Sequence, residues 1–280
     1  MIVASSALLL SACGTDQVQP DTSARAQLDR DTVQVVLPLD QYEVSDADEQ
    51  LVNNAVQTSL RACLNARGVN GLAPSAHSAP SEDRPYGLWN IERAAQFGYG
   101  FPEPEATAEP PLGGEWSSST DEAFNEAYTA CDGELASSLD AMSPPSSDAS
   151  TVRRLRETAY THAYQDQRWK DARAEWQACL TQHGLQARDD DSAWSSQQGL
   201  DVLTMIDPVA PDPGMKHEEI RVATIEATCN EQTQLTQRLG DIEAGYQAAL
   251  IKGQEATLAE EKQQNQAYVD AARAYLASHQ

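Results

Sequence analysis

Four cysteines spread over the body of the chain constrain its fold more than any other feature. They are Cys63, Cys131, Cys179 and Cys229. No CxxC pair occurs, and we expect no histidine at zinc-ligand spacing from any of them, so the pattern does not predict a zinc site. An even number of cysteines in an exported chain indicates disulfides, here two, and four cysteines allow three connectivities.

A repeated motif favours one of these connectivities. The pattern Ala-Cys-Leu, followed by a glycine four residues later, occurs at Cys63 and again at Cys179. Each copy lies at the end of an amphipathic stretch, and one further cysteine follows each copy. We therefore favour the pairs Cys63–Cys131 and Cys179–Cys229, each closing its own helical unit. A loop of this size contributes roughly 4 kcal/mol in the chain-entropy model of disulfide stabilisation.

The two bridges offset an amino-acid composition that supports only a small hydrophobic core. Leu, Ile, Val and Phe make up about 17% of the 280 residues, and the formal net charge is −24. Such a composition tends toward disorder unless something else stabilises the fold. The acidic balance also excludes nucleic acid as a partner, because binding there depends on Lys and Arg against phosphates.

The N-terminal residues are typical of an export signal. Residues 1–12 carry no charge and are too few to span a bilayer. The last three of these residues and the cysteine that follows read Leu10-Ser11-Ala12-Cys13, which resembles the lipobox of bacterial lipoproteins. The resemblance implies a diacylated Cys13 and a membrane anchor on the extracytoplasmic face. A basic stretch before the apolar run is missing, so we expect either that the true start lies upstream or that the start codon is misassigned.

The rest of the chain predicts a mainly α fold with a minor β element. We expect a flexible tether over residues 13–31, a first helical unit over 32–145 and a second over 146–280. Apolar spacings of three and four predict helices, and short apolar runs suggest strands. The expected helices are 46–66, a short one near 89–97, 120–140, 150–182 and 216–277, and the expected strands are 33–37 and 200–206.

The C-terminal stretch from residue 216 to 277 contains no proline and carries a heptad-like seam. An unbroken helix of this length would reach roughly 93 Å, at 1.5 Å per residue. We expect either a projecting arm or a hairpin that turns near Gly240, Gly245 or Gly253. The seam consists of Leu239, Ile242, Tyr246, Ala249, Gly253 and Ala256, and its small residues permit close approach of a partner helix.

Aromatic residues gather in the Gly/Pro-rich insertion between the first two body cysteines. Two interpretations are open: a satellite core beneath a long loop, or a platform for a solute or glycan. The residues are Tyr86, Trp89, Phe97, Tyr99, Phe101 and Trp116.

No motif for catalysis or cofactor binding occurs in the sequence. Gly98-Tyr99-Gly100 lacks the third glycine of a dinucleotide site. Asp189-Asp190-Asp191 lacks the later ligands of a calcium loop and indicates a solvated acidic loop. The five histidines stand singly, at His77, His162, His183, His217 and His279. We therefore expect no enzyme, no metal and no cofactor.

Several stretches resemble actinobacterial lipoproteins of uncharacterised function. These are Leu37-Pro38-Leu39-Asp40 with Tyr42, the two Cys-Leu-x3-Gly stretches, Gly98-Tyr99-Gly100, and Ala223–Cys229. Such proteins accompany efflux-type transport systems, so the resemblance implies an accessory role. We expect an adaptor that engages an envelope complex through its C-terminal helix. The alternative is a solute- or glycan-binding lipoprotein that uses the aromatic insertion.

Overall fold

The structure, a computed structural model, describes residues 18–69, 82–102, 122–144, 150–190, 193–205 and 212–279. It is mainly α-helical with one two-stranded sheet, as predicted. The elements in chain order are β1 (Gln27–Asp29), β2 (Gln34–Val36), the 3-10 helix η1 (Asp40–Tyr42), α1 (Asp46–Ala66), α2 (Ile91–Phe97), α4 (Glu122–Ala141), α5 (Thr151–Gln165), α6 (Gln167–Gln182), α7 (Gln197–Met205), α8 (Pro213–Thr233), α9 (Leu235–Ile251) and α10 (Glu255–Ser278).

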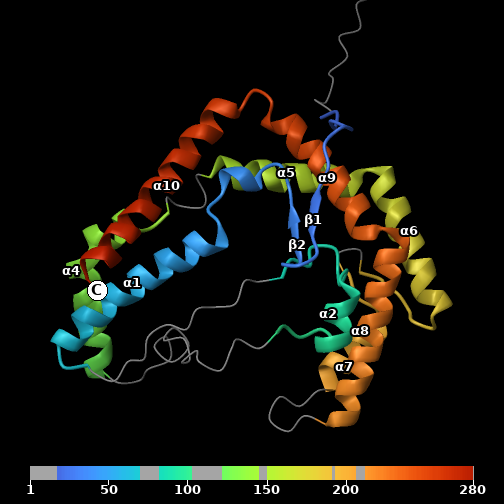
Figure 1. Ribbon diagram of the computed structural model, residues 1–280, viewed down its shortest axis with the longest axis horizontal. Helices are drawn as coiled ribbons and strands as arrows, with labels where there is room; N and C mark the ends of the chain where they lie inside the picture. Colours follow the sequence, from blue (N-terminus) through green and yellow to red (C-terminus); the bar gives the residue numbers. More distant parts are fainter. Residues whose placement is uncertain are drawn as a thin grey trace, which may run out of the picture.

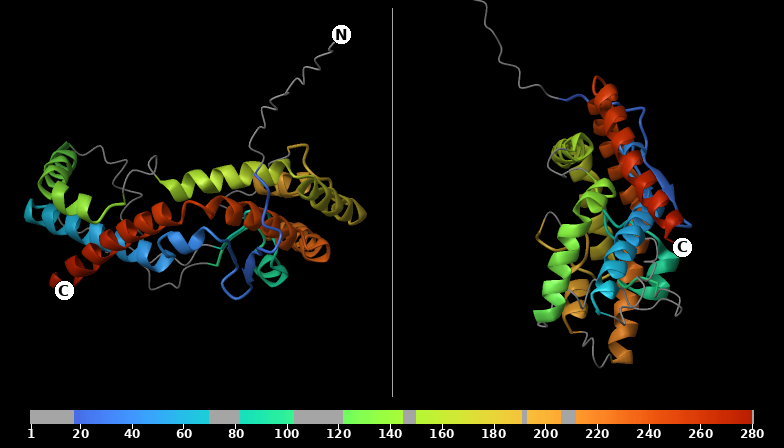
Figure 2. Two further views of the ribbon diagram at one scale, coloured as in Figure 1. Left: turned by 90° about the horizontal axis from the view of Figure 1, so that it is seen from above. Right: turned by 90° about the vertical axis from the view of Figure 1, so that its left-hand side faces the viewer.

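The helices form a flattened arch with two arms (Figures 1 and 2). One arm contains α1, α4 and α10, and the other contains α2, α6, α7 and α8. Helices α5 and α9 pack against each other at the top and join the arms. Within the described residues, no helix is both long enough and apolar enough to cross a membrane.

Both favoured disulfides are present. Cys63–Cys131 joins α1 to α4 in the first arm, and Cys179–Cys229 joins α6 to α8 in the second. The two arms do not follow the predicted boundary between units. Helix α10, from the second unit, packs on α1, whereas α2, from the first unit, packs on α8.

Local signals explain why α1 forms where the sequence predicts it. The side chain of Ser45 caps the helix by accepting from Asp48 N at 3.2 Å. Its inward stripe includes Leu60 and Leu64, which pack with Phe124 around the first disulfide. The chain then turns at Gly68, whose φ of +87° suits glycine.

The predicted helix over 150–182 is in fact two helices. Asp166 takes an extended conformation, and its carboxylate accepts from Arg168 N at 2.9 Å. The residue therefore ends α5 and caps α6, because a short acidic side chain satisfies the free N–H groups of a new first turn.

The long C-terminal stretch breaks twice and is neither a single arm nor a simple hairpin. The first break is at Gln234, which has a left-handed φ of +52°. Asn230 stabilises this break by accepting from Thr236 N at 3.0 Å. The second break is at Gly253, with φ +84°, one of the three glycines expected to allow a turn.

The other two glycines of that expectation lie inside α9 and have a different role. A Cβ atom on Gly240 would lie 2.7 Å from the Cβ of Ala26, and one on Gly245 would lie 3.1 Å from the carbonyl oxygen of Asp21. Their missing side chains let the N-terminal segment pack directly on the helix.

The expected tether therefore ends earlier than predicted. From Val18 onward the chain is docked: Asp21 N donates to the carbonyl oxygen of Gly245 at 2.9 Å, and Ala26 N donates to Asp241 at 3.0 Å. Strand β1 then pairs antiparallel with β2. The prediction of a flexible segment is wrong for residues 18–31, because polar composition hid their backbone pairing.

Of the two expected strands, only the first exists. β2 lies within 33–37, as predicted. The sequence predicts a second strand over 200–206, but residues 200–205 belong to α7 (Gln197–Met205), and residue 206 lies outside the described residues. The hydroxyl of Ser196 accepts from Gly199 N at 3.0 Å at the start of this helix, and Val202 is buried against the body. A helix-initiating serine thus outweighs the β preference of a short apolar run.

Candidate functional site

A cleft of about 970 Å³ lies at the inner corner of the arch, where the two arms meet. Its walls come from β2, η1, the start of α1, the loop before α2, α5 and one residue of α9. Its lining contains seven acidic side chains and two basic ones: Asp40, Glu43, Asp46, Glu82, Asp83, Glu157 and Glu243, with Arg84 and Arg156.

Arg156 holds the floor of the cleft together. One of its terminal nitrogens lies 2.8 Å from Asp40 and 2.7 Å from Glu43. The second oxygen of Asp40 accepts from Leu37 N at 2.6 Å. Helix α5 is thereby tied to η1 and to the chain that enters α1. A second hollow, of about 720 Å³, shares Glu43, Val44 and Arg156 with the cleft.

A buried polar chain forms the back of the cleft. The hydroxyl of Tyr86 donates to Glu243 at 2.7 Å, and the amide of Gln247 donates to the other oxygen of Glu243 at 3.1 Å. Gln247 in turn accepts from Leu39 N at 2.9 Å. This chain joins the aromatic loop, α9 and the η1 segment, and it satisfies the buried carboxyl group.

The loop before α2 supplies two further acids. Asp83 accepts from Val35 N at 3.1 Å and so fixes the loop to β2. Glu82 is nearly buried, with Arg84 at 2.6 Å and Arg93 at 3.3 Å. Arg84 also donates to the carbonyl oxygen of Gly100 at 2.8 Å. Arg84 and Glu82 therefore offset each other's charge, and the rest of the lining still contains six acids against one base, Arg156.

An exposed aromatic ring completes the cleft wall. Tyr160 of α5 keeps 38% of its surface exposed, and the edge-on ring of Trp169 fixes it at a centroid distance of 5.7 Å. The other apolar lining includes Val36, Val44 and Pro85. The cleft thus combines carboxylates with an aromatic face and aliphatic surface.

Burial shifts the pKa of three acids of this site in the same direction. It raises the pKa of Glu243, and also that of Glu43, where Arg156 partly counteracts the effect. Burial raises the pKa of Asp83 as well, against the hydrogen bond from Val35. A positive charge brought into the cleft would lower the pKa of each of these carboxyl groups, since a cation favours the ionised form.

Such a site can hold an organic cation. Carboxylates attract an ammonium or guanidinium group, an aromatic face adds cation–π attraction, and the aliphatic lining accepts an apolar body.

The residues predicted as an aromatic platform differ in their exposure, and among those that the structure describes Phe101 is exposed, at 57%. Tyr86 and Trp89 are 0% and 3% exposed and belong to the largest core, so they form neither a satellite core nor an open platform. Phe97 and Tyr99 are partly buried beside α8. Trp116 lies outside the described residues.

The Gly98-Tyr99-Gly100 motif has a structural role. Gly98 ends α2 with φ +66°, and the carboxyl of Glu219 occupies the space that a Cβ would need. That carboxyl accepts from Tyr99 N at 2.8 Å and pairs with Lys216 at 3.0 Å. The motif therefore locks α2 onto α8, and only a glycine fits there.

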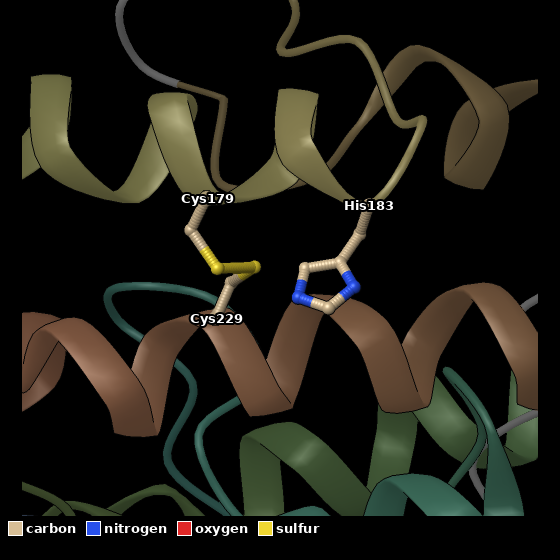
Figure 3. A group of neighbouring side chains, drawn as sticks. All are labelled: Cys179, His183 and Cys229. Atoms are coloured by element: carbon tan, nitrogen blue, oxygen red, sulfur yellow. A yellow bond between two sulfur atoms is a disulfide. The ribbon is translucent and has the colours of Figure 1, made fainter.

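Among the described residues, Cys179, His183 and Cys229 are grouped as metal ligands would be, with their ligand atoms within 4.8 Å of one another. The expectation of no histidine near a cysteine is therefore wrong, because the i, i+4 spacing of Cys179 and His183 puts both on one face of α6. Figure 3 shows the imidazole beside the disulfide. Both sulfurs belong to that disulfide, so the group offers one free ligand and does not fit a metal.

Sequence reasoning missed Tyr160, Arg156 and Glu243 as site residues. Glu243 carried a usable signal, since it is an acid beside the apolar residues of the seam and had to be buried with them. The sequence singles out Asp40 only within Leu37-Pro38-Leu39-Asp40, a stretch that resembles actinobacterial lipoproteins. Cys13 lies outside the described residues.

No family model, curated protein or solved structure matches this chain significantly.

Proposed function

We propose that this chain is an exported, lipid-anchored binding protein that captures organic cations in its acidic cleft. The single observation that carries the proposal is the cleft itself, where acidic residues from five separate segments share the lining with the partly exposed Tyr160.

The two disulfides support the exported location. Structural disulfides persist in oxidising compartments and are rare in the reducing cytosol. The lipobox-like segment ending at Cys13 supports an anchor, and lipid chains stabilise membrane binding by roughly 0.8 kcal/mol per buried methylene.

The adaptor hypothesis loses part of its support. The large residues of the C-terminal seam, Leu239, Ile242 and Tyr246, are buried in the protein's own core and are closed to a partner. Of the small seam residues, Ala249 is partly buried, and Gly253 and Ala256 are exposed. Helix α10 packs on α1, where Ala272 clusters with Ala55. Among the described residues, the large exposed apolar side chains belong to neither α9 nor α10.

The ligand class can be tested with three small probes of similar shape. Benzyltrimethylammonium is a cation, benzyl alcohol is neutral and benzoate is an anion. Binding to the native state raises the unfolding free energy by about 2.7 kcal/mol at a ligand concentration about a hundred times the dissociation constant. We expect the cation alone to raise the melting temperature. Equal increases of the melting temperature with all three probes, or no increase with any of them, would refute the proposed ligand class.

A further inference from the structure

We infer that the anchored protein lies with the face around its docked N-terminal segment against the lipid bilayer, so that both arms of the arch point away from the membrane. The inference rests on the lipid anchor of the proposed function. It concerns a surface that carries neither the cleft nor the disulfides.

The docked segment leaves little freedom between lipid and protein. Only five residue steps separate Cys13 from Val18, where the docked chain begins. Five extended residues span at most about 18 Å. The expected tether to residue 31 would instead have spanned about 60 Å by the same measure. The anchored end of the protein is therefore held close to the lipid surface.

Several contacts keep this segment attached to α9. Besides the backbone bond from Asp21 to Gly245, Lys252 lies 2.8 Å from the carboxylate of Asp21, and Gln237 donates to the carbonyl oxygen of Ala26 at 3.0 Å. The hydrogen bond from Lys252 holds the pKa of Asp21 well below its ordinary value. The attachment point is thus a built feature of the fold.

The charge of this face suits a membrane better than the charge of the cleft does. A hollow of about 400 Å³ beside the segment is lined by Arg25, Arg168 and Arg238 together with four acids. The chain as a whole carries −24, and the cleft has seven acids against two bases. Membranes that contain anionic lipids repel an acidic surface, so the nearly balanced face can approach them more closely than the acidic cleft can.

The shape of the molecule then sets the direction of the arms. In Figure 1 residues 18–25 lie at the top, beside α9 and the bend that leads into α10. Helices α7 and α4 lie toward the far ends of the two arms. A membrane above the docked segment would leave the inside of the arch facing the extracytoplasmic space.

Energy transfer from the protein to labelled lipid tests this orientation. The chain from residue 13 onward is coupled through the Cys13 thiol to maleimide-lipid in vesicles of phosphatidylglycerol and phosphatidylcholine that contain an acceptor dye. The donor dye is placed on an unnatural ketone amino acid, which leaves the disulfides intact. The four sites are Thr22 and Ala256 near the segment, and Glu126 and Met205 on the arms.

We expect strong transfer from the two near sites and at least severalfold weaker transfer from the two arm sites. Equal transfer from all four sites would overturn the inference. Chemical coupling supplies the anchor here, so the result does not depend on lipidation in the cell. The mass of Cys13-containing peptides from the native envelope tests lipidation separately.

Two variants show whether docking sets the orientation. Gly240→Val should displace Ala26 and abolish the near-to-far difference, whereas Gly133→Val, where a Cβ meets nothing within 4 Å, should preserve it. Because Gly240→Val could disturb α9, a second variant inserts a 20-residue Gly/Ser linker after Gln17. That insertion should also reduce the difference in energy transfer between the near sites and the arm sites. If this difference is unchanged in both variants, the short connection between Cys13 and the docked segment does not set the orientation.

Discussion

Glu243 shows at the residue scale how this fold tolerates an acid in an apolar core. The residue is 5% exposed, and its carboxyl group receives one hydrogen bond from Tyr86 and one from Gln247. A buried polar group that loses a partner costs free energy, whereas a satisfied one is nearly neutral. The sequence placed Tyr86 in an aromatic group but could not reveal this partner, which lies 157 residues away.

Replacing Tyr86 with Phe should therefore destabilise the protein. The change keeps the ring but leaves one oxygen of Glu243 unpaired, and we expect the free energy of unfolding to fall by about 1–3 kcal/mol. Chemical denaturation measures it. Tyr160→Phe is the matched control, since its ring is partly exposed at the cleft, and it should change stability by less than about 0.5 kcal/mol. Similar losses in both variants would contradict this account of Glu243.

The raised pKa of Glu243 also predicts a pH dependence. The folded state binds this proton more tightly than the unfolded state, so the group stabilises the fold fully below its ordinary pKa of 4.5. That contribution is lost as the pH rises from 4.5 through the raised value. Glu243→Gln should flatten the fall in stability over this window, and Glu126→Gln, on the exposed face of α4, should leave it unchanged. An unaltered slope in Glu243→Gln would show that another group causes the pH dependence.

At the scale of elements, helices are predicted where caps and stripes are local, and breaks are missed where they depend on distant contacts. Ser45 and the stripe behind it predicted α1 correctly. The break at Gln234 has no glycine or proline to announce it, and it depends on the side chain of Asn230. Gly240 and Gly245 looked like turn residues, but their role is to admit the N-terminal segment.

Two glycines in open surroundings should respond oppositely to alanine. Gly253 needs its φ of +84° to break α9 from α10, and nothing lies within 4 Å of a Cβ there, so backbone strain alone should cost about 1 kcal/mol. Gly133 lies within α4, also with open space, and alanine there should stabilise by about 0.5–1 kcal/mol. Thermal unfolding of the two variants shows whether each substitution stabilises or destabilises the protein. A stabilising Gly253→Ala would mean that the bend is not required.

At the scale of the whole molecule, the disulfides were predictable and the arch was not. A repeated local motif revealed the pairing, because each bridge closes one helix pair that is close in sequence. The packing of α10 on α1 joins segments about 200 residues apart, and that of α2 on α8 joins segments more than 100 apart. Sequence periodicity says which face of a helix is buried but not against which partner. The cleft lies where such distant segments meet, so it could not be predicted.

The two arms should depend on their disulfides to different degrees. In the first arm, α4 buries only Phe124 and Cys131, whereas the second disulfide lies in the largest core. Replacing both Cys63 and Cys131 with Ser should release α4 and speed its amide hydrogen exchange, while α8 and α9 stay protected. Loss of protection throughout the chain would show instead that the arch unfolds as a single unit.

The central claim is that the acidic cleft binds organic cations, and calorimetric titration with benzyltrimethylammonium tests it most directly. The wild type is compared with Tyr160→Ala in the cleft and with Tyr128→Ala on α4, where a tyrosine of similar exposure, 36%, lies outside the cleft. We predict saturable binding that Tyr160→Ala weakens by roughly 2- to 30-fold, the range of a cation–π contact, and that Tyr128→Ala leaves unchanged. Absence of saturable binding, or equal weakening in both variants, would contradict the claim.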